Sequence, residues 1–289
     1  SSAVLGSTAL RLAGDEAQQA RCMPALAAGT LRLAWAHDEA EGRQARHWLG
    51  TRAQRDGAHW RVSGRKVLVL HGAAAQQLVV SARVSGAAGD AAGRALFLVD
   101  PTAPGVQLRA HRLVDDSAAA ELLLDAAPAE ALGPVDDSAR HSAAIDGTLD
   151  AGIAAACADM TGAAETAYRL AVAYLHTRRQ FGRLIGDNQA LRHRAAEMLV
   201  SLEMCRSMAI AAAVALDRPG ADDSTVDLMR AKLVVGRHAR AVCQQAIQLH
   251  GGIGMTEEYE VGHALRRVHV LDHLFGDVDA QAVRLSSLL

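Results

Sequence analysis

The stretch Gln248-Leu249-His250-Gly251-Gly252-Ile253-Gly254-Met255-Thr256 decides how the rest of this chain is interpreted. It ends a long helical pattern with two glycines, and glycine at a helix C-terminus allows the left-handed backbone that other residues resist. Paired glycines also let another group approach the backbone closely. A second helical pattern follows, from Glu257 towards His273. The glycines alone are equally consistent with a helix cap and with a binding loop.

A second stretch occurs earlier in the chain: Arg178-Arg179-Gln180-Phe181-Gly182-Arg183-Leu184-Ile185-Gly186, followed by Gln189. It resembles the R-x-x-F-G-x-x-I motif of the acyl-CoA dehydrogenases, and the first stretch resembles the helix-end motif of the same family. The two motifs also occur in the family's order and at a fitting spacing. The resemblance implies an FAD-dependent oxidoreductase that acts on an acyl-CoA thioester.

The composition narrows the class of protein. The chain has 289 residues, half of them hydrophobic but only 3% aromatic, so alanine and other small residues must fill the core and we expect a large subunit interface. A net charge of −2 argues against a nucleic-acid partner. The histidines show no metal-ligand spacing, no signal peptide is visible, and no apolar run approaches the roughly 20 residues of a membrane span.

The cysteines indicate a reducing compartment. They are far apart, and three occupy apolar positions of helical patterns, as expected for reduced core residues of a cytoplasmic protein. The four are Cys22, Cys157, Cys205 and Cys243.

The order of patterns predicts an α+β fold with three parts. Residues 1–29 are helical, and by resemblance they are the end of an N-terminal helical domain. Residues 30–135 contain short apolar runs separated by turn signals, without intervening helices, which predicts an antiparallel β-domain. Residues 136–289 predict a C-terminal four-helix bundle, with apolar stripes over residues 153–174 and 191–212. Asp217-Arg218-Pro219-Gly220 ends one helix, and Asp222-Asp223-Ser224 offers the next N-cap.

The resemblance assigns cofactor roles to seven residues. A guanidinium gives charge-assisted hydrogen bonds to a pyrophosphate, and by resemblance Arg178 and Gln180 bind that part of FAD. Phe181 and Gln189 lie by the adenosine, and Gln248, Gly251 and Gly252 contact the same half of the cofactor. In this family the flavin ring sits on the β-domain of one subunit, while the adenosine half reaches the bundle of its neighbour.

The residues that would hold the flavin ring differ from the family's pattern. The segment from Ala34 to Arg43 lacks the family's threonine and substrate-contacting serine. After Gly64-Arg65-Lys66, the leucines Leu68 and Leu70 replace the ring-contacting tryptophan and the hydroxyl donor. The flavin-ring half of the site is therefore expected to be degenerate.

The catalytic base is missing from both of its expected places. These enzymes remove an α-proton with a glutamate while the β-hydride passes to the flavin. Alignment of Arg266 with the family's arginine puts Phe275 at the glutamate's position, and a phenylalanine cannot accept a proton. The alternative position falls on Gly152, so Asp150 and Asp277 are the remaining alternatives and the base stays unassigned.

Three functions remain open. The first is an obligate subunit of a heteromeric acyl-CoA dehydrogenase, such as a heterotetramer for steroid-side-chain or fatty acyl thioesters, which supplies the pyrophosphate half-site to a homologous partner. The second is an ordinary homo-oligomeric dehydrogenase with an unconventional base. The third is a non-catalytic scaffold that binds an acyl-CoA or another chain without FAD.

Overall fold

The computed structural model describes residues 1–43, 45–57, 59–218 and 223–288. The chain divides into two compact units, Ser1–Gly152 and Ile153–Leu289. The division falls inside the long helix α3 (Ser138–Thr177). The predicted limits at residues 29/30 and 135/136 follow changes of secondary structure instead, and they remain predictions.

The first unit begins with the expected helical segment. A π-helical turn, η1 (Ser2–Gly6), leads into α1 (Ser7–Ala13), and α2 (Glu16–Ala27) follows after a short break. Asp15 caps α2 by accepting from the backbone N–H of Gln18, whose side chain bonds back to the Asp15 N–H. This reciprocal cap explains why the polar break separates two helices.

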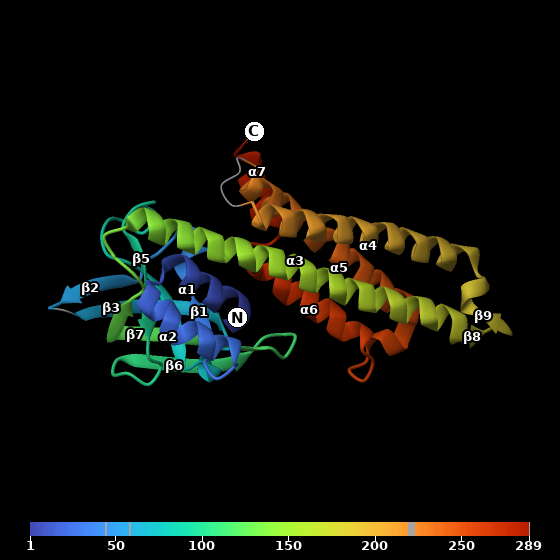
Figure 1. Cartoon of the computed structure of the whole chain (residues 1–289). Coiled ribbons are helices and arrows are strands. Elements are labelled where there is room, and N and C mark those ends of the chain that lie inside the picture. Colours follow the sequence, from blue (N-terminus) through green and yellow to red (C-terminus); the bar gives the residue numbers. More distant parts are fainter. Residues whose placement is uncertain (44, 58, 219–222, 289) are drawn as a thin grey trace. The chain divides into compact units, whose positions relative to one another are not determined.

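A seven-stranded sheet follows within the described residues, with two short helical turns in its loops. The order is β1-β4-β2-β3-β7-β5, β6 lies on β7, and β5 also pairs with β4, so the sheet closes on itself. Its elements are β1 (Leu33–Ala36), η2 (Ala40–Gly42), β2 (Arg52–Asp56), β3 (His59–Leu70), η3 (Gly72–Ala74), β4 (Gln77–Arg83), β5 (Arg94–Val99), β6 (Val106–Arg112) and β7 (Ala118–Ala131). Figure 1 shows these strands with α1 and α2 beside them.

The sheet is mixed rather than antiparallel. The strand β4 runs parallel to β1 and, at one pair, parallel to β2. The reason lies in the connection, because between β1 and β4 the chain reverses once from β2 to β3 and again from β3 to β4. Fourteen buried residues, including Val62, Leu78 and Phe97, form the interior cluster of this sheet.

The second unit holds the predicted bundle. Its elements after α3 are β8 (Arg179–Gln180), β9 (Arg183–Leu184), η4 (Ile185–Asp187), α4 (Gln189–Leu216), α5 (Ser224–His250), η5 (Gly251–Met255), α6 (Val261–His273) and α7 (Val278–Ser286). The Pro219-Gly220 break and the Asp222 position lie outside the described residues. Asp223 directly precedes α5, but its side chain makes no capping hydrogen bond.

The predicted apolar stripes pack inside the unit, and a different face of α4 is exposed. Met198, Leu202 and Cys205 are buried, whereas five apolar residues on the opposite side of α4 are 40–66% exposed: Leu199, Val200, Met204, Ile210 and Val214. By length and composition alone, α4 is apolar enough to cross a membrane, which corrects the expectation from the sequence. An apolar helix of a soluble protein meets the same criterion.

Candidate functional site

A hairpin carries the first group of predicted residues. β8 and β9 are joined by Phe181 and Gly182, whose φ values of 50° and 78° are both positive. Two-residue hairpin turns with this backbone match the twist of the strands, but a positive φ is uncommon for a phenylalanine. Phe181 is 99% exposed. The fold therefore holds a large apolar side chain in solvent at a backbone position that glycine or asparagine would fill with less strain.

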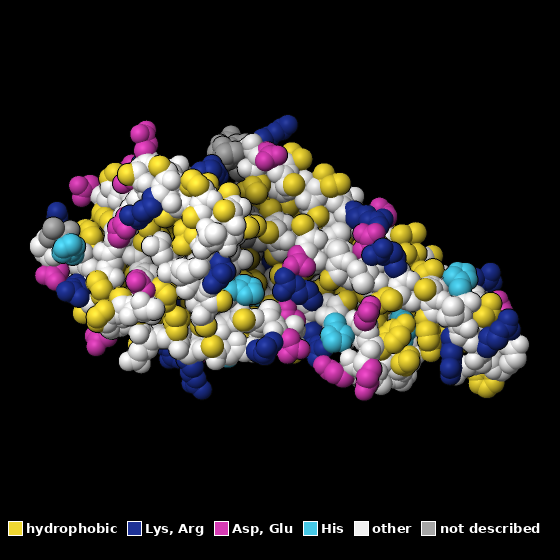
Figure 2. All heavy atoms as spheres, turned by 60° about the horizontal axis from the view of Figure 1, so that its bottom comes forward, with side chains coloured by type: hydrophobic (Ala, Val, Ile, Leu, Met, Phe, Trp, Pro, Cys, Tyr) yellow, Lys and Arg dark blue, Asp and Glu magenta, His cyan; other side chains and the backbone are white. Residues whose placement is uncertain are grey.

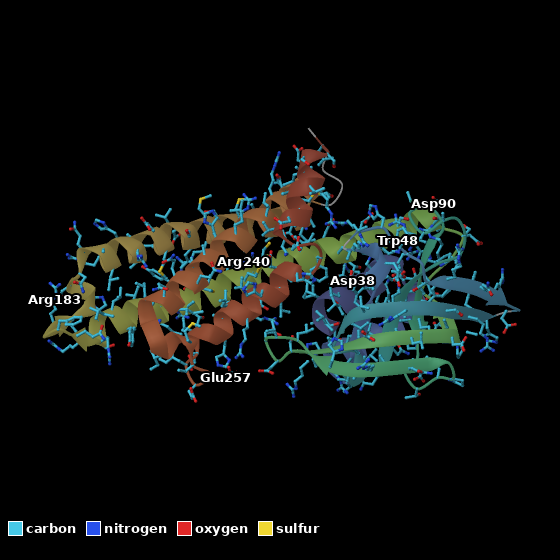
Figure 3. The ribbon with its side chains drawn as sticks, turned by 180° about the vertical axis from the view of Figure 1, so that it is seen from behind. Asp38, Trp48, Asp90, Arg183, Arg240 and Glu257 are labelled. Atoms are coloured by element: carbon cyan, nitrogen blue, oxygen red, sulfur yellow. The ribbon has the colours of Figure 1, made fainter. Side chains whose placement is uncertain are left out.

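Arg178 combines a fixed backbone with an exposed side chain. Its N–H donates to the Tyr174 carbonyl at 2.9 Å, and its carbonyl accepts from the Ile185 N–H at 2.9 Å. Within the described residues, no hydrogen bond or ion pair engages its guanidinium. Arg183, labelled in Figure 3 at the hairpin, instead donates to the Asn188 side chain at 2.6 Å. Of these two arginines, Arg178 is the one whose charge is available to an anion.

The glutamines of the first motif lie close along the chain. Gln180 is exposed on β8, and Gln189 is the exposed first residue of α4. The hairpin and η4 are the only structure between them. One short segment therefore brings Arg178, Gln180, Phe181 and Gln189 to the junction of α3 and α4.

The second group lies at the end of α5. Gln248, Gly251 and Gly252 are exposed, and Gly251 has φ 66° and ψ −139°. A Cβ at either glycine would meet no atom within 4 Å, so both leave open space beside the backbone. Gly254 differs, because a Cβ there would lie 2.8 Å from the Ile247 carbonyl. The first two glycines keep the turn accessible, while the third allows close packing.

One residue that the sequence did not single out joins the two groups. The imidazole of His250 stacks on Tyr174 at the end of α3, with ring centroids 4.6 Å apart. Nδ1 lies 2.7 Å from the Ala246 carbonyl, and Nε2 lies 3.2 Å from the Tyr259 hydroxyl. His250 stands inside the decisive motif, but nothing in its spacing shows that Tyr174 is its neighbour.

The surface at this end of the bundle is basic and apolar together. Figure 2 shows Lys or Arg side chains beside hydrophobic ones at the end of the helical unit where Figure 1 places β8 and β9. Ile253 and Met255 on η5 are 43% and 79% exposed. An anionic group and a flat aromatic ring would each find a complementary side chain on this surface.

The segment aligned with the family's threonine is buried and closed by its own contacts. His37 is 3% exposed, with Nδ1 2.9 Å from Ser81 Oγ and Nε2 donating to the Arg46 carbonyl at 3.1 Å. Burial, and then the nearby Lys66 charge, lower the pKa of His37 to about 3. Its ring is therefore neutral and has no free nitrogen for a cofactor.

A buried ion pair lies beside His37. Lys66 Nζ is 2.7 Å from Glu39 Oε1, and both side chains are almost completely buried. Burial would raise the pKa of Glu39, but Lys66 and hydrogen bonds from Thr51 outweigh it and lower that pKa. Lys66 also donates to the His37 carbonyl and to Ser81. These groups satisfy one another within the sheet.

The two leucines at the flavin-contact positions lie on an irregular part of β3. The pairing with β7 shifts register between Lys66 and Val69, and Leu68 has a positive φ of 53°. Leu68 and Leu70 are both partly exposed. A bulge re-aims the side chains beside it, but neither leucine offers a hydrogen-bonding atom in its side chain.

Both alternative bases already have structural partners. Asp150 Oδ1 accepts from Arg46 Nη2 at 2.6 Å, although burial raises its pKa despite that charge. Asp277 caps α7 by accepting from the Ala280 N–H at 2.8 Å. Phe275 has a φ of 62°, and its carbonyl accepts from Gln281. The structure thus assigns Asp277 a helix-capping role and ties Asp150 to an arginine.

A separate polar cavity of about 160 Å³ lies in the second unit, lined by residues that include Arg240, His269, Asp272 and His273. Asp272 is paired with Arg240 at 2.6 Å and faces the buried Lys232. Arg240 is labelled in Figure 3. In the part of the chain that the structure describes, no three His, Cys, Asp or Glu side chains are grouped to hold a metal ion.

Comparison with known proteins identifies the family. Residues 143–285 match the acyl-CoA dehydrogenase C-terminal domain. The probable acyl-CoA dehydrogenase YngJ of Bacillus subtilis (strain 168) is 29% identical over 274 residues, which are 93% of this chain and 71% of the relative. The caffeyl-CoA reductase-Etf complex subunit CarC of Acetobacterium woodii is 26% identical over 286 residues, 97% of this chain and 74% of the relative.

A solved structure agrees over nearly the whole chain. A chain in a variant of the Tcur3481-Tcur3483 steroid ACAD is 31% identical, with a TM-score of 0.86, and the match covers 98% of this chain and 74% of that chain. The similarity includes the sheet as well as the bundle. This chain therefore belongs to the acyl-CoA dehydrogenase family, whose members are FAD-dependent oxidoreductases that act on acyl-CoA.

Proposed function

We propose that this chain is a subunit of a heteromeric acyl-CoA dehydrogenase, in which it supplies the adenosine and pyrophosphate half-site for FAD to a homologous partner subunit. The observation that carries the proposal is an asymmetry between two sets of residues. Those that would serve a cofactor on a neighbour are exposed. Those that would hold a flavin ring on this chain are replaced or engaged in internal contacts.

The residues of the bundle fit the pyrophosphate half of FAD. Among the described residues nothing pairs with the guanidinium of Arg178, whose backbone is fixed, and Gly251 and Gly252 leave their backbone open. A guanidinium is suited to planar, charge-assisted hydrogen bonds with phosphate oxygens. Phe181 offers an exposed ring for an adenine. In this arrangement the chain binds and orients one half of the cofactor, which supplies hydride acceptance when bound.

The residues of the sheet do not fit the flavin ring. His37 has both ring nitrogens engaged inside the unit, and Leu68 and Leu70 have no polar side-chain atoms. A flavin carbonyl or ring nitrogen buried against them would lack a partner, at a cost of roughly 1–3 kcal/mol for each group. No step of the reaction is therefore assigned to this chain's own flavin-contact positions.

The apolar face of α4 supports assembly with another subunit. Its five exposed residues are Leu199, Val200, Met204, Ile210 and Val214. Exposed apolar surface of this kind is typical of an interaction site. We assign it to a homologous subunit rather than to a lipid bilayer, because Arg206 lies on the same helix and pairs with Glu165 of α3.

The alternative is a catalytically competent homo-oligomer, and one observation favours it. The raised pKa of Asp150 moves that carboxylate towards the range of a general base.

The visible spectrum of the purified protein separates these possibilities. The chain is purified once alone and once together with the protein encoded by the neighbouring gene. Flavin absorbance only in the presence of a partner supports the heteromer. Flavin and turnover by the chain alone support the alternative, and colourless protein in both preparations indicates a scaffold without FAD.

A further inference from the structure

The carboxyl end of α5 is held to two other segments by a single buried histidine. His250 is 4% exposed. Its ring packs against Tyr174 of α3 on one side, with centroids 4.6 Å apart and planes 30° apart. It also meets Tyr259, which follows η5, at 4.8 Å. A segment far away in the sequence and a segment nine residues further along therefore both contact this imidazole.

The hydrogen bonds fix which ring nitrogen carries the proton. Nδ1 lies 2.7 Å from the Ala246 carbonyl, and a carbonyl can only accept, so Nδ1 must donate. In the neutral imidazole, Nε2 then accepts from the Tyr259 hydroxyl at 3.2 Å. Each ring nitrogen of His250 therefore has one defined hydrogen-bond role, Nδ1 as donor and Nε2 as acceptor. A phenylalanine of similar size would keep the stacking but lose both hydrogen bonds.

Tyr174 connects this ring to Arg178. The Tyr174 carbonyl accepts the Arg178 N–H at 2.9 Å, one helical turn further along the chain. The residue after His250 is Gly251, where the open turn begins. A Cβ placed at Gly254 would lie only 2.9 Å from the Cβ of His250. Through its stacking on Tyr174 and its chain connection to Gly251, the imidazole therefore links Arg178 to the two glycines.

We propose that His250 is a positioning residue that holds Arg178 and the Gly251-Gly252 turn in the geometry required to bind one pyrophosphate. The proposal rests on the half-site function proposed above. A pyrophosphate spans only a few bonds, so its ligands must lie close together; in catalysis, a displacement of about 1 Å can cost on the order of 100-fold in rate. A histidine that only stabilised the fold would show no energetic coupling to Arg178, and this difference can be measured.

A double-mutant cycle on cofactor affinity tests this role. FAD and ADP affinities are measured by equilibrium dialysis on the assembled protein for Arg178→Ala, His250→Phe and the double variant. Tyr259→Phe removes only the hydroxyl that Nε2 contacts, so it replaces His250→Phe in the cycle if that variant does not fold. Tyr168→Phe is the matched control, because this half-buried tyrosine of α3 makes no hydrogen bond to Tyr174, His250 or Tyr259 within the described residues.

We expect Arg178→Ala to weaken FAD binding about ten- to hundredfold, and to lose most of that effect in the His250→Phe or Tyr259→Phe background. Interacting residues give such non-additive effects. Full additivity would overturn the positioning role while leaving the half-site intact. An Arg178→Ala variant with unchanged affinity for both ligands would instead contradict the half-site itself. Tyr168→Phe should bind both ligands as the parent does.

Discussion

Arg46 Nη2 lies 2.6 Å from Asp150 Oδ1, and the Nε of the same guanidinium lies 3.1 Å from Asp146 Oδ1. The Arg46 and Asp150 side chains are only 10% and 17% exposed. The carboxylate closest to the family's alternative base position is thus part of an ion-pair cluster. To act as a base, Asp150 would have to leave Arg46 and accept a proton from the substrate. Its ion pair with Arg46 instead gives this carboxylate a structural role.

The cluster predicts different results for substitutions at Arg46 and at Asp150. Arg46→Met should destabilise the protein by about 3 kcal/mol, because it leaves a largely buried carboxylate unpaired. Asp150→Asn should leave acyl-CoA turnover by the assembly unchanged. Urea unfolding measures the first and a dye-linked dehydrogenase assay the second. The double variant should recover part of the loss, whereas abolition of turnover by Asp150→Asn alone would identify it as the base.

The low pKa of buried His37 predicts that the folded protein loses stability in acid. Its pKa is about 3 in the folded protein and near 6.5 when unfolded, so between these values the unfolded state binds the extra proton. Stability must then fall as the pH drops below 6.5, and about 2 kcal/mol should be lost by pH 5. His37→Gln should show a smaller difference between urea unfolding at pH 6.5 and pH 5. An equal difference in both proteins would show that His37 does not cause the sensitivity.

The proposed role of Arg178 predicts that its substitution lowers FAD affinity more than substitution of its neighbour in the same motif. Arg178→Ala should weaken FAD binding in the assembly about ten- to hundredfold, because one charge-assisted bond is worth roughly 1.5–3 kcal/mol. Arg179→Ala removes the same charge from the adjacent exposed residue of β8 and is the control. The circular dichroism of both variants should match the parent. Equal losses of affinity would indicate a general effect of charge instead.

The exposed face of α4 predicts a change in oligomeric state. Combined Val200→Glu and Ile210→Glu changes should dissociate the assembly, because they place two charges in an apolar contact. Light scattering with size-exclusion chromatography reports the mass, and the parent should be larger than the 30.4 kDa chain. Ala213→Glu, exposed on the flank of the same helix, should preserve the assembly. A monomeric parent would contradict the interface.

The sequence predicted those parts of the fold that local patterns determine. The stripe through Ile153 and Cys157 is buried, and the glycine at 251 ends α5 with a positive φ. It did not predict β2, because Arg52–Asp56 is polar and mostly exposed and is a strand through its pairing with β3. The hairpin of β8 and β9 was missed for a similar reason, since each strand has only two residues.

In the candidate site, too, the local features were predicted from the sequence and the long-range contacts were not. The accessibility of Arg178 and Phe181 follows from a motif within one segment, and motifs are local. The contacts of His250 with Tyr174, of Lys66 with Glu39 and of Arg46 with Asp150 join residues far apart in sequence. Such pairs depend on how the elements pack, and neither periodicity nor spacing in one sequence specifies them. The predicted subunit interface needed the same information, because only packing shows which face of α4 stays exposed.

The central claim is that FAD occupies a site shared with an unlike chain, and the ratio of FAD to polypeptide in the purified assembly tests it most directly. The flavin released by denaturation is quantified by absorbance, and each chain is quantified by amino-acid analysis. We predict one FAD per pair of unlike chains, with no flavin retained by this chain purified alone. One FAD per copy of this chain in an active homo-oligomer would contradict the account.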